Sequence, residues 1–186
     1  KHPDHVTDVA RALDWINDNI DKYGGDIKHL ALLGHSAGAH LVALVATDSS
    51  HLAVHGHKLA MLRCVGSLDT QAYDIEAVMK AAKGGTKSSY ENAFGTDSAT
   101  WKAASPSTHV AAGKGIPAML LAQRGTATRR AILSAFVAKL KAGKVSSTVI
   151  DASSLTHGEV KEHIGMAKDT VMTKPLMAFL KTCLGG

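Results

Sequence analysis

The sequence predicts an α/β fold in which a mostly parallel sheet is flanked by helices on both faces. Strand-like and helix-like segments alternate along the chain. The first strand-like segment is apolar without polar alternation, which is typical of a strand covered on both sides. The chain has 186 residues, of which 45% are hydrophobic and 20% charged. It can therefore bury the core of a folded domain, and wholesale disorder is excluded.

The N-terminal segments predict a helix, a strand and a second helix. Residues 4–23 carry apolar side chains at helical spacing, and the Gly24-Gly25 pair ends this helix. Residues 27–33 (IKHLALL) are short and apolar, as in a buried strand. Residues 37–47 (AGAHLVALVAT) combine small and apolar side chains, which predicts a helix that packs closely on the sheet.

The middle of the chain predicts two further strands around an irregular stretch. Residues 60–68 (AMLRCVGSL) form the second strand. Residues 116–123 (IPAMLLAQ) form the third, with Pro117 at its start, where a missing N–H donor is tolerated. Residues 71–109 are expected to be the least regular part, because pairs of glycine and serine interrupt them.

The C-terminal segments complete the alternation. Residues 128–142 show an amphipathic helical pattern that Gly143 closes. Residues 145–150 are rich in β-branched side chains and predict the fourth strand, and residues 170–184 predict the last helix. No repeat or linker interrupts the sequence, so residues 1–186 are expected to form one domain.

Composition excludes several classes of partner. Lys and Arg outnumber Asp and Glu by 21 to 16, but they are scattered and aromatic residues make up only 4%. No nucleic-acid partner is therefore expected. No apolar run approaches the roughly 18 residues that span a bilayer, so no membrane partner is expected and the cytoplasm is the favoured compartment. Cys64 and Cys183 lie far apart and are expected to be two isolated buried thiols.

One motif carries chemistry. Residues 34–38 read GHSAG, which is the G-x-S-x-G pattern between a predicted strand and a predicted helix. In this context the serine sits on a strained turn with its hydroxyl exposed. The motif predicts that Ser36 is a nucleophile, although a tight glycine turn with an incidental serine is the alternative. Backbone N–H groups at a helix N-terminus favour negative charge, so the N–H of Ala37 is the expected oxyanion donor.

With this motif the chain resembles the α/β-hydrolase superfamily, in the esterase/lipase branch related to hormone-sensitive lipase and kynurenine formamidase. The resemblance extends over essentially all 186 residues. The segment DHVTDVARALDWINDNIDKYGGD resembles the approach to the nucleophile, and SLDTQAYDI, WKAASPSTHV and IPAMLLAQRGT resemble later segments of the branch. The resemblance implies an α/β-hydrolase fold and the chain order nucleophile, acid, histidine.

Family order places the catalytic histidine on the loop after the last strand, where His157 stands. His163, six residues further along the chain, is the alternative candidate for the catalytic histidine. His35 and His40 flank the nucleophile in sequence and are expected to be packing or surface residues, since the turn points His35 away from the Ser36 hydroxyl.

The acid departs from the family pattern. The family aspartate follows the penultimate strand in a phrase G-T-x-D, but residues 125–128 read GTAT, so Thr128 stands in its place. Asp69, which closes the second strand, is the expected acid, and Asp151, which closes the fourth, is the alternative. A serine–histidine dyad or a degenerate enzyme is also compatible with the sequence. Asp74 is expected to be a turn or capping residue.

The start of the chain suggests missing elements. In the family, the second oxyanion donor comes from an upstream HGG-type loop that this sequence lacks. The first residue is Lys1, and the strand at 27–33 would be an apolar sheet edge. We therefore expect that N-terminal strands are missing and that the chain is the C-terminal part of a catalytic domain. A second protomer in a homo-oligomer could instead cover the edge.

Together these residues predict a serine hydrolase that cleaves carboxylic esters, with short acyl groups favoured, through an acyl-enzyme. An arylformamidase-type amidase and a degenerate hydrolase-fold binding module are the alternatives. Neither a metal nor an organic cofactor is expected. His51, His55 and His57 lack the spacing of a metal motif and are expected to form a solvated loop cluster.

Overall fold

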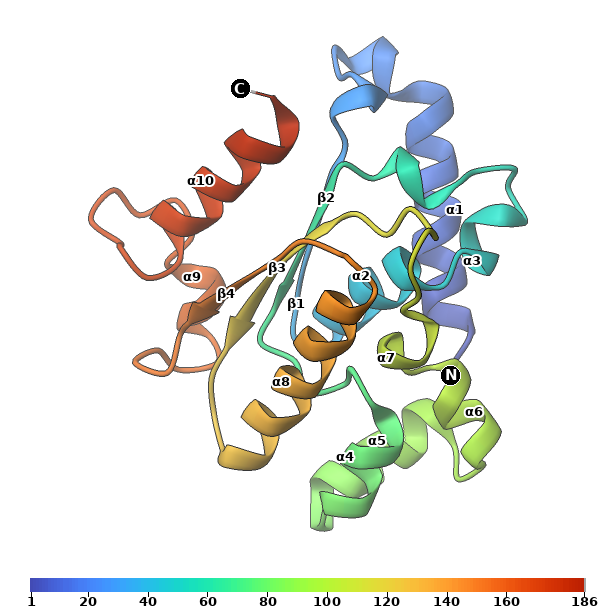
Figure 1. Cartoon of the computed structure of the whole chain (residues 1–186), viewed down its shortest axis with the longest axis vertical. Coiled ribbons are helices and arrows are strands. Elements are labelled where there is room, and N and C mark those ends of the chain that lie inside the picture. The colour runs from blue at the N-terminus through green and yellow to red at the C-terminus, as the bar shows by residue number, and fades with distance from the viewer. Residues whose placement is uncertain (186) are drawn as a thin grey trace.

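The computed structural model describes residues 1–185 around a four-stranded parallel sheet (Figure 1). The strands lie in the order β1-β2-β3-β4 and cover Ala31–His35, Cys64–Leu68, Ala118–Gln123 and Ser147–Asp151. Leu68 pairs with His35 on one side and with Ala122 on the other. Gln123 pairs with Asp151. The carboxyl ends of all four strands therefore meet at one edge of the sheet, where parallel α/β folds place their ligands.

Helices cover both faces of the sheet, as predicted. α2 (Ala37–Thr47) and α8 (Ala127–Ala142) pack on one face, and α1 (Asp4–Asn19) lies against α2. α9 (Glu159–Glu162) and α10 (Thr173–Leu184) lie on the opposite face (Figure 1). Each face has its own apolar core: the strands contribute Val65, Met119 and Leu121 to the first and Leu68, Leu120 and Ile150 to the second.

The first helix and the first strand are shorter than predicted, whereas the second helix has the predicted bounds. α1 ends at Asn19, and Ile20–Tyr23 continues as a 3₁₀ turn that Gly24 closes with a φ of 79°. The strand predicted over 27–33 begins only at Ala31. Ile27–His29 form a 3₁₀ turn instead, because the Asp26 side chain accepts a hydrogen bond from the Lys28 N–H.

Residues 71–109, expected to be the least regular part of the chain, are more regular than predicted. They contain four short helices, α4 (Ile75–Ala81), α5 (Gly84–Phe94), α6 (Ser98–Ala103) and α7 (Pro106–His109). Side-chain caps at Asp74 and Asp97 start two of them. α5 buries none of its residues, so its sequence carries no apolar stripe by which a helix could be recognised.

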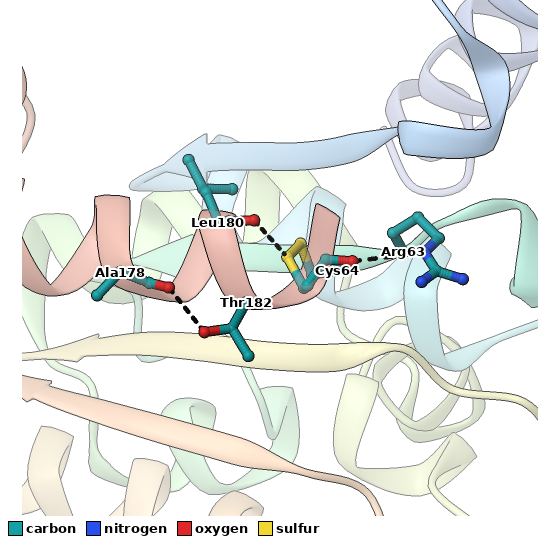
Figure 2. Close-up of a disulfide and its surroundings, with 6 residues drawn as sticks. Arg63, Cys64, Ala178, Leu180 and Thr182 are labelled. Atoms are coloured by element: carbon teal, nitrogen blue, oxygen red, sulfur yellow. Dashed lines mark hydrogen bonds between the residues drawn. A yellow bond between two sulfur atoms is a disulfide. The ribbon is translucent and has the colours of Figure 1, made fainter. Parts of the chain in front are cut away.

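The expectation of two isolated thiols is also wrong, because Cys64 and Cys183 form a disulfide (Figure 2). Cys64 begins β2 and Cys183 lies in the last turn of α10, at a sequence separation of 119 and with 6.1 Å between their Cα atoms. The Arg63 Nε donates a hydrogen bond to the Cys183 carbonyl. The packing of α10 along β2 brings these distant residues together.

Two further features bear on the surroundings of the fold. Within residues 1–185, β1 pairs only with β2, and Leu33 on this edge strand is 41% exposed. In the same part of the chain, no helix has the length and apolar character required to cross a membrane.

Candidate active site

Ser36 occupies the turn between β1 and α2. Its φ of 58° and ψ of −118° are the strained conformation that the motif predicts. The Ser36 N–H donates to the Leu68 carbonyl at 3.0 Å, which fixes the turn to the neighbouring strand. The turn also requires Gly34, because a Cβ atom there would collide with the carbonyl group of Gly38 at the start of α2.

A buried polar network lies beneath this turn. The Ser67 hydroxyl donates to the Ala39 carbonyl at 2.9 Å and lies 2.8 Å from the Tyr73 hydroxyl, which therefore donates to Ser67. Burial raises the pKa of Tyr73, so its hydroxyl stays protonated. The Tyr73 ring stacks on Phe136, with 4.5 Å between the ring centroids. The network links β2 to the first turn of α2 and so stabilises the turn that carries Ser36.

His157 lies on the loop between β4 and α9, with its ring between Ser36 and Asp69. Its Nε2 is 2.9 Å from the Ser36 Oγ, and its Nδ1 is 2.5 Å from the Asp69 Oδ2. A neutral ring that donates its Nδ1–H to the carboxylate presents a bare Nε2 to the serine hydroxyl. This is the geometry of a nucleophile, a general base and an orienting acid.

Asp69 follows β2 and is only 1% exposed. Its φ of 56° is in the left-handed region, and its N–H donates to the Ala122 carbonyl. Two arginines pair with its carboxylate: the Arg124 Nη1 lies 3.1 Å from Oδ2, and the Arg129 Nη2 lies 2.5 Å from Oδ1. Burial alone would raise the pKa of Asp69, but His157 and the two arginines outweigh it and hold the pKa below the ordinary value. The carboxylate is therefore ionised at neutral pH.

A cavity of about 450 Å³ opens over these residues. Ser36, Asp69 and His157 line it together with apolar side chains from α5 and hydroxyl-bearing side chains from α5 and the end of β2. Ala37 also lines the cavity. As the first residue of α2, Ala37 contributes one of the N–H groups that have no partner within a helix. Its N–H is thus available at the place where the sequence predicts an oxyanion donor.

The other sequence candidates lie elsewhere. Asp151 is exposed at the end of β4, and its carboxylate accepts a hydrogen bond from the Ser153 N–H. His163 pairs with Asp169 at 3.3 Å. Thr128 is exposed on α8, and Asp74 caps α4 through the Ala77 N–H. Only Asp69, among the carboxylates considered from sequence, reaches His157.

Comparison with known proteins places this chain in a family. The BD-FAE family model matches residues 1–127, which include the nucleophile turn and Asp69. The chain belongs to the BD-FAE family. Two relatives come from Mycobacterium tuberculosis. Esterase LipQ is 48% identical over 48 residues, which are 26% of this chain and 11% of LipQ. The probable carboxylic ester hydrolase LipM is 52% identical over 44 residues, 24% of this chain and 10% of LipM.

Solved esterase structures share the fold of this BD-FAE member. Esterase B from Lactobacillus rhamnosis superposes with a TM-score of 0.73 at 18% identity and covers 97% of this chain and 61% of its own. EstE5 superposes with a TM-score of 0.71 at 20% identity, and the match covers 100% of this chain and 62% of the EstE5 chain. The predicted α/β-hydrolase fold and the predicted resemblance are confirmed. The chain spans about three fifths of these structures, and the aligned segments of the curated relatives about a tenth of their length.

Sequence reasoning missed the two arginines that this BD-FAE member places on Asp69. Arg124 and Arg129 follow β3, on either side of the GTAT segment where the family acid is expected. The available signal was the cluster of Arg124, Arg129 and Arg130 beside a missing carboxylate. A group of cations without a local acid predicts an acid from a neighbouring strand, which here is Asp69.

Five further histidines considered from the sequence lie outside the line from Asp69 through His157 to Ser36. His40 is buried in α2, where its Nε2 donates to the Ala104 carbonyl at 2.7 Å, and burial lowers its pKa to about 4. His35 packs as expected, but its ring lies against His157. The expectation of a solvated cluster is wrong. His55 and His57 both pair with Asp14 of α1, His51 pairs with Asp48, and all three side chains are largely buried.

One group of side chains in residues 1–185 has the composition of a metal site, namely His35, Asp69 and His157. Its atoms are already engaged: Asp69 accepts hydrogen bonds from His157 and two arginines, and the His35 Nε2 donates to a carbonyl. Two guanidinium groups beside the only carboxylate oppose the binding of a cation. The group therefore suits proton transfer better than metal binding.

Proposed function

We propose that this chain carries the catalytic centre of a serine hydrolase that cleaves carboxylic esters. The observation that supports it is the continuous line from Asp69 through His157 to Ser36, with distances of 2.5 and 2.9 Å. Three residues from three different loops meet in the order that acyl transfer requires. The esterases among its relatives, including LipQ, favour an ester as substrate.

In the first half of the reaction, the Ser36 Oγ attacks the ester carbonyl while the His157 Nε2 takes its proton. The carbonyl oxygen becomes an oxyanion and accepts a hydrogen bond from the Ala37 N–H. Asp69 stabilises the imidazolium that forms on His157. When the tetrahedral intermediate collapses, the bond to the leaving alcohol breaks and His157 gives that alcohol its proton. Ser36 then carries the acyl group.

In the second half, His157 removes a proton from water, and the resulting hydroxide attacks the acyl-enzyme carbonyl. The same oxyanion donor acts again, and the bond to the Ser36 Oγ breaks as His157 returns the proton to it. The products are a carboxylic acid and an alcohol. A cavity of about 450 Å³ fits small substrates, so we propose short acyl groups.

The test uses p-nitrophenyl esters from acetate to octanoate, with p-nitroacetanilide as the amide counterpart. We expect turnover of the short esters and little cleavage of the anilide. Ser36→Ala should lose about 10⁴-fold or more in kcat, since the nucleophile is removed. Ser49→Ala, which replaces an exposed serine outside the cavity, is the matched control and should retain wild-type activity.

A fluorophosphonate probe provides a readout that does not depend on the choice of substrate. We expect covalent labelling of Ser36 in the wild-type chain and none in Ser36→Ala. A folded wild-type chain that neither hydrolyses any ester nor reacts with the probe would overturn the proposal in favour of a binding module. Faster cleavage of anilide than of ester would favour the amidase.

For the compartment, the disulfide favours an oxidising environment over the cytoplasm, because cytoplasmic thiols are kept reduced. Mass analysis of the unreduced protein, isolated from its native source, tests this through the state of Cys64 and Cys183. Two free thiols would instead support the cytoplasm.

A further inference from the structure

His35 ends β1 and immediately precedes the nucleophile, yet its ring turns toward the base. Its Nε2 lies 2.8 Å from the backbone carbonyl oxygen of His157. A carbonyl can only accept, so the Nε2 of His35 carries the proton and donates. The two imidazole rings lie 4.5 Å apart between centroids, with 36° between their planes. Two separate contacts thus join His35 to the same residue, one to its backbone and one to its ring.

His157 needs such support because of where it stands. It lies on the 152–158 loop rather than on a helix or strand, and its side chain is 49% exposed. Asp69 and Ser36 bind the two ring nitrogens, and neither of these two hydrogen bonds involves the backbone that carries the ring. Arg124 holds the same loop two residues earlier, through the Leu155 carbonyl at 2.9 Å. His35 supplies the contact at His157 itself.

The charge state of His35 suits this place. Burial lowers its pKa, and the nearby His157 acts in the same direction, while the hydrogen bond to the His157 carbonyl and the charge of Asp69 oppose them. The ring is therefore neutral at neutral pH. A charged ring would repel the imidazolium that forms on His157 during acyl transfer, whereas a neutral donor holds the loop without that cost.

We propose that His35 is a positioning residue for the base: its Nε2–H fixes the His157 backbone, and its ring supports the His157 imidazole beside Ser36. The inference rests on the proposed hydrolase function. It assigns a role to the second residue of the GHSAG motif that differs from its sequence-based expectation as an ordinary packing residue. Misplacing the base lowers the rate of proton transfer but leaves the cavity that binds the substrate intact.

Three substitutions separate the hydrogen bond from the ring contact. His35→Gln places an amide donor at about the reach of Nε2, His35→Met has a similar length without a donor, and His35→Phe keeps a ring without a donor. We expect the Met and Phe variants to lose about tenfold or more in kcat with KM within about twofold of wild type. His35→Gln should recover most of the kcat lost in His35→Met.

His29→Phe is the matched control, since His29 is exposed before the opposite end of β1 and its ring pairs with Asp26. It should leave kcat unchanged. Thermal unfolding and the rate of fluorophosphonate labelling are measured for every variant, so that a loss of folded protein is separated from a misplaced base. If His35→Phe folds poorly, the Gln and Met pair decides.

Wild-type kcat in the Met and Phe variants would overturn the inference, as would a His35→Gln variant no faster than His35→Met. A rise in KM at constant kcat would also overturn it, because that result assigns His35 to substrate binding. These outcomes require an active wild-type chain. They are therefore distinct from failure of the proposed function, in which the wild type neither turns over esters nor reacts with the probe.

Discussion

The guanidinium of Arg124 binds the carboxylate of Asp69 and, at the same time, the loop that carries the base. Its Nη1 lies 3.1 Å from the Asp69 Oδ2, and its Nε lies 2.9 Å from the Leu155 carbonyl oxygen. The planar fork of arginine holds both donors in a fixed geometry on two different nitrogen atoms, whereas a lysine donates from a single nitrogen at the end of a flexible stem. Arg124 thus joins the end of β2 to the 152–158 loop, which His35 contacts at His157.

This double contact predicts that shape matters at Arg124 as much as charge. Arg124→Lys keeps the positive charge but loses one of the two bonds, so we expect kcat to fall about tenfold, and Arg124→Met to fall at least as far. Steady-state kinetics on p-nitrophenyl butyrate measure the loss. Arg130→Gln is the control, because Arg130 is exposed and its guanidinium donates to the Gly125 carbonyl outside the cavity. An Arg124→Lys variant as fast as wild type would show that charge alone suffices.

Exchange of each candidate acid decides between Asp69 and Asp151. Asp69→Asn should lower kcat by about 10⁴-fold, because an amide cannot hold His157 in the required tautomer or stabilise its charge. Asp151→Asn removes a charge at an exposed strand end, where the amide oxygen can still accept from the Ser153 N–H, and its kcat should stay within about threefold of wild type. Both variants are compared at matched folded concentration. A larger loss at Asp151 than at Asp69 would reverse the assignment.

Sequence could narrow the acid to these two residues but could not choose between them. Both end a strand at the same edge of the sheet, since Asp69 and Asp151 follow neighbours of β3 on either side. Which carboxylate reaches His157 depends on the direction of its side chain. For Asp69 that direction is set by its left-handed φ and by the arginines that follow β3. These are tertiary relationships, and no local pattern specifies them. The GHSAG turn could be recognised because its demands are local: a left-handed serine and a glycine before it.

The difference between local patterns and tertiary relationships also explains which parts of the fold could be predicted from the sequence. Strands and long helices with an apolar stripe were predictable, because the spacing of apolar residues along the sequence indicates which face of the element is buried. The short helices of residues 71–109 depend instead on caps and on docking over the site, and α5 has no buried residue at all. The disulfide was missed for a related reason. Cys64 and Cys183 meet only because α10 returns to β2 over a separation of 119 residues.

Gly34 should be intolerant of even the smallest side chain. The added methyl group of Gly34→Ala would collide with the carbonyl of Gly38, and it would lie 2.9 Å from the Ala39 N atom. We expect a loss of about 1–3 kcal/mol in the free energy of unfolding, together with lower activity as α2 moves away from β1. Gly38→Ala is the control, because a Cβ atom there meets nothing within 4 Å. Urea unfolding measures both, and equal stability of the two variants would contradict the prediction.

The Cys64–Cys183 disulfide should stabilise the fold by closing a long loop. We expect Cys183→Ser to lower the free energy of unfolding by about 2–4 kcal/mol, since the reduced unfolded chain gains freedom. Activity at room temperature should change little, because the disulfide lies at the amino end of β2, away from Ser36. Unfolding of the wild type with and without a reducing agent provides the comparison. A reducing agent that destabilises Cys183→Ser as much as wild type would show that the bond is not the cause.

Asp169 should make the docking of α10 depend on pH. Its carboxylate accepts hydrogen bonds from the N–H groups of Met172 and Thr173, at 2.7 and 2.5 Å, where α10 begins. Burial alone would raise the pKa of Asp169, but these bonds prevail and lower it to about 2 from an ordinary value of 3.8. A lowered pKa in the folded state stabilises the protein above pH 3.8, and the stabilisation is lost as the pH falls toward 2.

Asp169→Asn should therefore lower Tm at pH 7 and 5, with a gap to wild type that narrows at pH 3. Asp18→Asn, on the exposed face of α1, is the control. A gap that is constant from pH 7 to pH 3 would assign the loss to packing rather than to the carboxylate charge.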